Sequence, residues 1–241
     1  MKILTLNMNM FNYTVDDSFK IYLNEINPDI VAIQECRYKR IGNIGNEYKI
    51  LLPNQFSESE INNRIHLTLV LSKDKNDHRK DIKTSGKYDY TFLQVENTIP
   101  LLTAVHLPMK CQAFAKEYED LLNAISTSDS LIVCGDFNAS LKKKTENWNF
   151  LQKLISDHDY SNLWDEGLTN NKAFFINYAG NKLPADKDKY YRTYVGNTHI
   201  DYVLAKRNLI SLETITIDSR TLAFTDHCGI ITEFDMTTDL E

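Results

Sequence analysis

The sequence predicts an α/β fold in which layers of strands are covered by helices. Short apolar runs typical of buried strands alternate along the chain with amphipathic stretches at helical spacing. The strands come in groups that helices separate, which is the order expected of stacked layers. Only 8 glycines and 5 prolines occur among 241 residues, so no flexible linker is expected to divide the chain. We therefore expect one domain over residues 1–241.

The first predicted elements are a strand, a helix and a second strand. Lys2–Leu6 is a short apolar strand, and Asp17–Ile26 is a helix with apolar residues on one face. Pro28 ends that helix, because the residue before a proline avoids helical dihedrals. The apolar run within Asp29–Gln34 predicts a buried strand. Further strands are expected at Tyr48–Leu52, His66–Ser72, Thr91–Glu96 and Leu101–His106.

The second half continues with two more helices. Cys111–Ile125 and Trp148–Ile155 have helical apolar spacing, and the strand Leu131–Cys134 between them stops at a glycine. The polar stretch Thr169–Tyr191 predicts a long, irregular surface insert, in which Phe174-Phe175-Ile176 is read as a buried strand or as an apolar staple that anchors the insert. The last strands are expected at Ile200–Leu204, Leu212–Ile217 and Gly229–Phe234.

Composition narrows the classes of protein that fit. The cysteines are isolated from one another, without a C-x-x-C pair or a zinc spacing, so we expect reduced thiols. They are Cys36, Cys111, Cys134 and Cys228. No apolar run is long enough for a membrane span or a signal peptide. We expect a cytoplasmic monomer.

The charge is acidic overall but uneven. The chain carries 33 acidic and 27 basic residues, a net charge of −6, which excludes a globally basic nucleic-acid binder. Two short basic runs stand out, Arg37 to Arg40 and Lys142-Lys143-Lys144. Such runs are usually solvated loops, but these two closely follow candidate catalytic residues. We therefore predict that Arg37, Arg40 and the three lysines form a rim that contacts a polyanionic substrate.

Polar residues recur at the ends of the apolar strands. They are Asn7, Glu35, His106, Asp136, Asn138, Asp201, Asp226 and His227. Each one alone is more often a turn former, a helix cap or a structural histidine. If the strand ends converge, however, the carboxylates form a negative cluster that needs a cation or shared protons. Oxygen ligands without sulfur suit Mg²⁺ or Mn²⁺, which can neutralise a phosphate during an in-line displacement.

The same residues lie in short motifs that occur in a characteristic order. These motifs are Leu6-Asn7, Ile33-Gln34-Glu35, Val105-His106, Gly135-Asp136-Phe137-Asn138, Ile200-Asp201-Tyr202 and Thr225-Asp226-His227. Together they resemble the endonuclease/exonuclease/phosphatase superfamily, which includes DNase I, exonuclease III-type AP endonucleases and neutral sphingomyelinases. The resemblance covers nearly the whole chain. It implies a four-layer α/β/β/α sandwich, with two central mixed β-sheets flanked by helices, and metal-dependent hydrolysis of phosphoesters.

The resemblance also implies roles for individual residues. Glu35 is similar to the principal metal carboxylate, assisted by Asn7 and Asp226. Asp136 is similar to the residue that orients or deprotonates the attacking water, and Asn138 to a contact for phosphate and transition state. His227 resembles the catalytic histidine that Asp201 holds. His106 matches the second histidine of the DNase I and sphingomyelinase branches, which argues against cleavage at abasic sites.

Three functions are compatible with this reading. A Mg²⁺- or Mn²⁺-dependent DNA nuclease with little sequence specificity is favoured, because basic runs flank the expected site. The alternative is a hydrolase of the same superfamily that acts on a small phosphorylated metabolite, a nucleotide or a lipid head group. A non-catalytic binding module is the remote third reading, since every expected catalytic position is filled.

Overall fold

The computed structural model describes most of the chain. The described residues are 1–11, 17–41, 44, 46–53, 59, 67–80, 92–97, 101–108, 115–127, 130–143 and 146–235. None of the described helices is long and apolar enough to cross a membrane.

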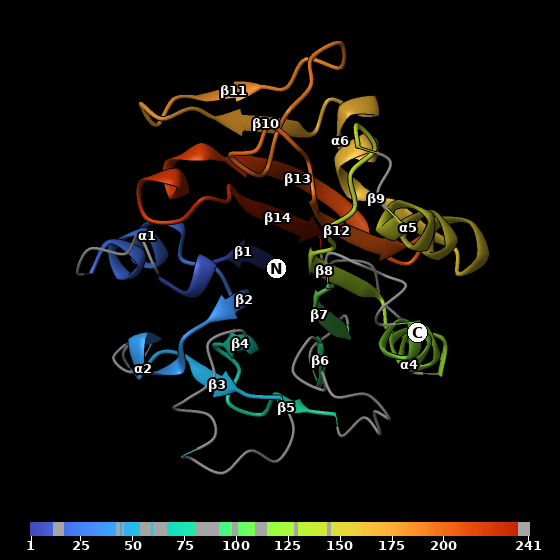
Figure 1. The fold of residues 1–241 in the computed structure, drawn as a ribbon. Helices are drawn as coiled ribbons and strands as arrows, with labels where there is room; N and C mark the ends of the chain where they lie inside the picture. The colour runs from blue at the N-terminus through green and yellow to red at the C-terminus, as the bar shows by residue number, and fades with distance from the viewer. Residues whose placement is uncertain are drawn as a thin grey trace.

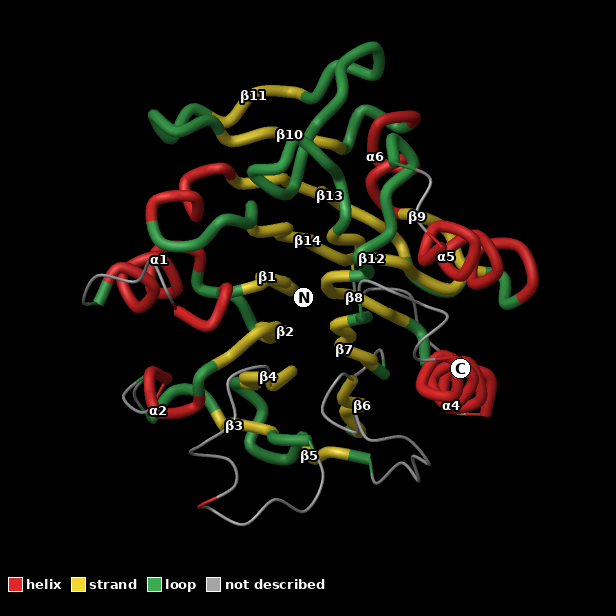
Figure 2. The backbone as a smooth tube through the Cα atoms, viewed as in Figure 1, coloured by secondary structure: helices red, strands yellow, loops and turns green. Residues whose placement is uncertain are grey.

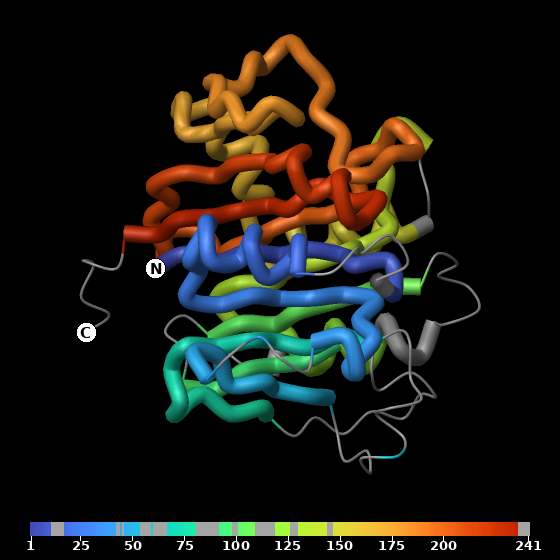
Figure 3. The backbone as a smooth tube through the Cα atoms, turned by 90° about the vertical axis from the view of Figure 1, so that its left-hand side faces the viewer, coloured from blue at the N-terminus to red at the C-terminus, as the bar shows by residue number. Residues whose placement is uncertain are grey.

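Two mixed sheets form the centre of the protein. The larger has eight strands in the order β11-β10-β13-β14-β1-β2-β4-β3. Its strands are β1 (Lys2–Asn7), β2 (Ile30–Cys36), β3 (Lys49–Leu51), β4 (Leu67–Ser72), β10 (Ala173–Ile176), β11 (Lys182–Pro184), β13 (Ser211–Asp218) and β14 (Gly229–Asp235). Figure 3 looks onto this sheet. Strands β1 and β2 pair in parallel, whereas β1 and β14 pair antiparallel.

The smaller sheet has six strands in the order β5-β6-β7-β8-β12-β9. They are β5 (His78–Arg79), β6 (Phe92–Glu96), β7 (Leu102–His106), β8 (Ile132–Asp136), β9 (Tyr160–Asn162) and β12 (Asp201–Lys206). The helices are α1 (Ser18–Ile26), α2 (Tyr38–Ile41), α4 (Ala115–Thr127), α5 (Glu146–Asp157) and α6 (Leu163–Thr169), with 3-10 turns at Asn9–Phe11 and Ser219–Ala223.

The predicted four-layer sandwich is confirmed. Figures 1 and 2 show α1 and α2 outside the larger sheet and α4 and α5 outside the smaller one. One apolar core joins the two sheets, and its members include Ile3, Ala32, Ala104 and Val203. A second core lies between the larger sheet and α1, and a third between the smaller sheet and the pair α4 and α5.

Alternation along the strands explains why polar side chains collect at one end of the inter-sheet core. Ile3 on β1 and Cys134 on β8 belong to that core, and so do alternate residues on the neighbouring strands. Because a strand repeats every two residues, Asn7, His106, Asp136 and Asp201 continue these apolar rows at the strand ends. Asp136 is directly opposite both His106 and Asp201 in the strand register. The site therefore caps the core between the sheets.

Glu35 reaches this edge because β2 contains a bulge. The pairing of β2 with β4 passes from Ile33 opposite Leu69 to Cys36 opposite Leu67, so β2 holds one extra residue. Both Ile33 and Cys36 face the outer helices. Glu35 takes a left-handed conformation with φ 47°, which turns it out of the regular alternation.

Gly135 lets two central strands approach closely beside the site. Its φ is +140°, and a Cβ atom built there would lie 1.9 Å from the carbonyl oxygen of Val105 on β7. Only glycine tolerates this contact and this dihedral. The packing brings the end of β8 against the end of β7, from which Asp136 and His106 project.

One prediction about local structure was wrong. The stretch Thr169–Tyr191 is not irregular throughout, because β10 and β11 form a hairpin that extends the larger sheet. Phe174-Phe175-Ile176 does form a strand, as predicted, with its two phenylalanines half-buried. The first basic run continues into the short helix α2, residues 38–41, in which Ile41 and Tyr38 pack on the core. Cys36, Cys134 and Cys228 are buried free thiols, and Cys111 lies outside the described residues.

Candidate active site

A cavity of about 440 Å³ opens where the strand ends converge. It is lined by residues from both sheets and from the loops that connect them. They are Asn9, Glu35, His106, Pro108, Asp136, Asn138, Ser140, Lys143, Tyr194, Thr198, Ile200, Asp226 and His227. Both signs of charge line this cavity, with carboxylates on strand ends and a lysine on a loop.

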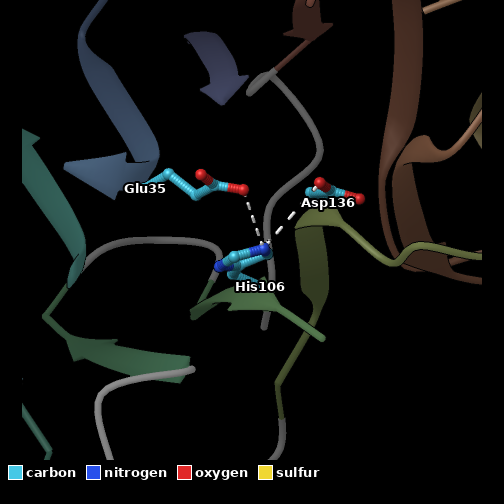
Figure 4. Close-up of side chains that lie close together, drawn as sticks. All are labelled: Glu35, His106 and Asp136. Carbon is cyan, nitrogen blue, oxygen red and sulfur yellow. Dashed lines mark ion pairs between the residues drawn. The ribbon is translucent and has the colours of Figure 1, made fainter. Parts of the chain in front are cut away.

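Glu35, His106 and Asp136 meet on one side of the cavity (Figure 4). The Nε2 atom of His106 lies 3.4 Å from Oε1 of Glu35 and 3.9 Å from Oδ2 of Asp136. Asn7 links the same two carboxylates, since its Nδ2 donates to Glu35 Oε1 at 3.2 Å and to Asp136 Oδ2 at 2.9 Å. The hydroxyl of Thr225 donates to the Asn7 carbonyl oxygen and ties this strand end to the loop before β14.

His227 and Asp201 form a buried pair on the other side. The Nδ1 atom of His227 lies 3.0 Å from Oδ2 and 3.2 Å from Oδ1 of Asp201. This contact leaves Nε2 as the ring nitrogen for the cavity. Asp201 is held in turn, because its backbone N–H donates to the hydroxyl of Thr193. The ring of Tyr194 packs against the imidazole of His227 at a centroid distance of 4.9 Å.

Burial and crowding perturb the ionisation of these groups. Burial, reinforced by the negative charge of Asp201, raises the pKa of Asp136 to about 7. Burial lowers the pKa of His227, but the charge and hydrogen bond of Asp201 outweigh it and raise that pKa to about 9. The site thus holds more negative charge than it can neutralise alone, which favours a protonated His227.

The donor set fits a hard divalent cation. Two groups of side chains have ligand atoms within 4.8 Å of one another, Glu35 with His106 and Asp136, and Asp136 with Asp201 and His227. Asp226 adds an oxygen to the same cavity: its Oδ1 is buried without a hydrogen-bond partner and lies 3.8 Å from Nε2 of His227. A buried carboxylate oxygen without a donor is costly, and a cation would satisfy it.

The two loops after β7 and β8 are joined by asparagines. Asn138 Nδ2 donates to the Leu107 carbonyl oxygen at 2.7 Å, and its backbone N–H donates to Asp136 Oδ1 at 2.8 Å. Asn147, at the start of α5, is fully buried and donates through Nδ2 to the carbonyl oxygens of Pro108 at 2.8 Å and Phe137 at 2.9 Å. Asn147 thereby fixes the distance between the two loops.

Asn147→Ala is expected to lower kcat by about tenfold. The substitution removes the side-chain donor that bridges the carbonyl oxygens of Pro108 and Phe137 and loosens the loops that bear the cavity residues, at a stability cost of roughly 1–3 kcal/mol. The control is Asn162→Ala, which removes a side chain that caps α6 by accepting from the Trp164 N–H. Both variants should lose stability in thermal unfolding, but only Asn147→Ala should lose turnover. Equal kcat values would remove Asn147 from this role.

The structure brings most of the predicted site residues together. Seven of them line the cavity or contact its lining through side chains, namely Asn7, Glu35, His106, Asp136, Asn138, Asp226 and His227, and Asp201 holds the last. Of the basic residues, Lys143 lines the cavity and Lys142 is exposed beside it. Arg37 and Arg40 are absent from the lining, and Lys144 lies outside the described residues.

Sequence reasoning missed four residues that support the site. Tyr194 lies just after the stretch read as irregular, and Thr193 and Asn147 had no motif to mark them. Thr225 begins the motif Thr225-Asp226-His227, but the motif does not indicate that its hydroxyl bonds to the Asn7 carbonyl. Asn147, Tyr194 and Thr225 act through contacts with segments distant in sequence, and Thr193 through a loop contact eight positions away, which no motif encodes.

Solved structures with a similar fold cover nearly all of the chain. The 3'-5' exonuclease NExo from Neisseria meningitidis is 15% identical with a TM-score of 0.69, covering 98% of this chain and 100% of that one. An AP endonuclease from Archaeoglobus fulgidus is 14% identical with a TM-score of 0.68, covering 98% and 99%. TDP2 from C. elegans is 16% identical with a TM-score of 0.57, covering 97% and 74%. At these identities the likeness shows the fold alone.

A search of the curated proteins finds no match. The family model described as the endonuclease/exonuclease/phosphatase family matches residues 4–227, a span that begins in β1 and ends at His227. It includes each strand end that contributes to the cavity. The chain therefore belongs to the endonuclease/exonuclease/phosphatase family of phosphoester hydrolases.

Proposed function

We propose that the protein is a divalent-metal-dependent phosphodiesterase that cleaves DNA with little sequence specificity. The observation that carries the proposal is the convergence of carboxylates from both sheets on one cavity, beside the His227–Asp201 pair. Such a cluster is unfavourable without a cation, and a cation beside two imidazoles is suited to hydrolysis of a phosphoester.

Glu35 and Asp226 are the proposed ligands of Mg²⁺ or Mn²⁺. The unpartnered Oδ1 of Asp226 supports this assignment, as does the exclusively oxygen character of the two side chains. Asn7 directs its Nδ2 toward Glu35 and Asp136, so it would ligate through its amide oxygen only if the amide turned over. When bound, the ion supplies positive charge that neutralises the phosphate and the leaving oxygen.

The remaining side chains are assigned roles in the transfer of a proton and the stabilisation of charge. A water attacks phosphorus as the bond to the leaving oxygen breaks, and Asp136 orients that water and accepts its proton. Protonated His227, held by Asp201, stabilises the negative charge that grows on the phosphorane oxygens. Asn138 and His106 contact the phosphate.

The basic rim supports DNA as the substrate. Lys143 lines the cavity and Lys142 is exposed next to it, so positive charge stands at the mouth of an otherwise acidic protein. One structural neighbour from Neisseria, 16% identical with a TM-score of 0.67 over 98% of this chain, is a 3' phosphatase bound to a product DNA hairpin. A contact of Arg37, Arg40 or Lys144 with the substrate stays a prediction.

A small phosphoester is the second candidate substrate. The cavity volume of about 440 Å³ is within the range of sites that enclose small ligands. A nucleotide or a phosphorylated metabolite would fill it without a contact beyond the cavity lining.

Incubation with supercoiled plasmid in Mg²⁺, with EDTA as the control, tests the proposed function. We expect nicking that EDTA abolishes and that Mg²⁺ or Mn²⁺ restores, and a melting temperature that the same ions raise. Inert plasmid with turnover of bis-p-nitrophenyl phosphate would indicate the second candidate. Absence of turnover on every phosphoester with either ion would contradict both.

Neutralising the lysine rim is expected to weaken DNA cleavage and its dependence on salt. Each phosphate contact contributes a slope of roughly 0.7–0.9 to the plot of log affinity against log salt. Lys142→Gln with Lys143→Gln should therefore lower the slope of log kcat/KM by about one to two. The matched control is Lys153→Gln with Lys182→Gln, which removes two exposed charges elsewhere. Identical slopes for the two double variants would exclude the rim from substrate binding.

The buried cysteines bear on the cellular location. The three described cysteines are buried free thiols, which is usual in the reducing cytoplasm. We propose a cytoplasmic monomer.

A further inference from the structure

Large apolar side chains are exposed on two loops beside the cavity. Leu141 is 57% exposed in the loop after β8, and Tyr190 and Val195 are 50% and 45% exposed in the loop before β12. The same loops supply Lys143 and Tyr194 to the cavity lining. Exposed apolar surface next to a polar site marks a place where another molecule binds.

Tyr190 is fixed at the rim of the cavity. Its hydroxyl oxygen accepts a hydrogen bond from the backbone N–H of His199 at 2.6 Å. His199 stands between Thr198 and Ile200, and both of these line the cavity. The ring is therefore held by its hydroxyl, although half of the side chain is open to solvent.

Lys142 lies over this ring. Its Nζ atom is 5.6 Å from the centroid of Tyr190, and the next residue in the chain lines the cavity. An immobilised aromatic ring loses little conformational entropy when a second ring stacks on it. An ammonium beside that ring can reach the phosphate of a stacked nucleotide.

We propose that Tyr190 and Lys142 form a subsite that stacks an unpaired base of a nucleic-acid strand next to the phosphate in the cavity. The proposal rests on the proposed function, which it deepens by adding a subsite for an unpaired nucleotide of the DNA substrate. Bases in a duplex are already stacked on their neighbours, so only an unpaired or splayed nucleotide can use the ring.

The charges on the same loop favour a strand over a lipid surface. Asp186 and Asp188 are exposed a few residues before Tyr190. Insertion of this loop into a bilayer would dehydrate both carboxylates, which is costly. A strand that stacks on the ring leaves them in water.

Fluorescence anisotropy with labelled oligonucleotides in EDTA tests the subsite apart from hydrolysis. Tyr190→Ala is expected to weaken the binding of a single-stranded oligonucleotide by about tenfold. Tyr190→Phe, which keeps the ring, should remain within about threefold of wild type. The control is Tyr178→Ala, which removes a ring that is 63% exposed on the β10–β11 turn and should leave the affinity unchanged.

An oligonucleotide with abasic spacer residues separates stacking from attraction between charges. The difference between wild type and Tyr190→Ala should shrink to about twofold or less on this strand and on a hairpin duplex. Equal affinities of wild type and Tyr190→Ala for the normal single strand would overturn the proposal. So would an equal loss on all three ligands.

Two further outcomes keep the two proposals distinguishable. If wild type binds single strands through Tyr190 but hydrolyses none with Mg²⁺ or Mn²⁺, the subsite stands and the proposed function fails. If Tyr190→Ala loses binding to sphingomyelin–phosphatidylserine vesicles while its affinity for oligonucleotides is unchanged, the loops bind lipid and the subsite is excluded.

Discussion

Replacing Asp136 with asparagine is expected to reduce kcat by at least about a thousandfold while stabilising the metal-free protein at alkaline pH. The loss of turnover follows from the removal of the proton acceptor, with little change in substrate affinity. Asp159→Asn, which neutralises an exposed carboxylate paired with Arg207, is the control and should retain full turnover. Wild-type turnover in Asp136→Asn would remove the proposed role.

The gain in stability follows from the pKa of Asp136. Burial raises this pKa from 3.8 to about 7, so ionisation of the carboxyl opposes folding. The penalty is absent below about pH 4, grows as the pH rises to about 7 and is constant above it. A shift of this size corresponds to a penalty of roughly 4 kcal/mol, which Asp136→Asn removes. The mismatched hydrogen bond between the new amide and Asn7 cancels about half of that gain.

Thermal unfolding in EDTA measures this change in stability. At pH 8 the melting temperature of Asp136→Asn should exceed that of wild type by roughly 4–8 °C. At pH 4 the order should reverse, because the carboxyl is then neutral and the mismatched hydrogen bonds remain. The same difference at both pH values would mean that folding does not raise the pKa of this carboxyl.

Disrupting the His227–Asp201 pair is the second change with a large expected effect. His227→Gln and Asp201→Asn should each lower kcat by about a thousandfold, because each removes the oriented positive charge from the transition state. The double variant should be little worse than either single one, since the two side chains act as a unit. Multiplicative losses would show that they act independently.

The pair also predicts a pH dependence of stability with the opposite sign. The pKa of His227 rises from 6.5 to about 9 on folding in the absence of metal. Protonation therefore stabilises the fold fully below about pH 6.5, and this contribution is lost as the pH rises through 9. His227→Gln should cost roughly 2–4 kcal/mol more at pH 6 than at pH 10 in denaturant titrations in EDTA. A cost independent of pH would contradict the raised pKa.

Much of the fold and the site could be predicted because both depend on local signals. Apolar runs of strand length marked β1, β2, β7 and β8. Period-two alternation directs the polar residues that end β1, β7 and β8 to one edge, and the bulge in β2 brings Glu35 there. The motif around Asp136 and Asn138 was informative because its glycine, Gly135, is required by the contact with Val105. These features are readable in one sequence since each is specified within a few residues.

What could not be predicted depends on distant contacts. Strand β11 is short and exposed along its length, so its strand character comes from pairing with β10, which itself pairs with β13. Helix α2 contains part of the first basic run. Its helical structure depends on the packing of Ile41 against the core, which the sequence of the run does not reveal. The basic residues differ in the same way. Lys143 lines the cavity, whereas Arg37 just before α2 and Arg40 within it are absent from the lining.

The pairing of β1 with β14 determines when during synthesis the catalytic machinery can exist. Asn7 belongs to the first strand, while His227 immediately precedes the last, and the Thr225 hydroxyl meets the Asn7 carbonyl across 218 positions. A nascent chain whose last strand has not yet been synthesised contains Asn7 but lacks His227. Fragments that end before His227 lack the His227–Asp201 pair, so we expect them to show no hydrolysis.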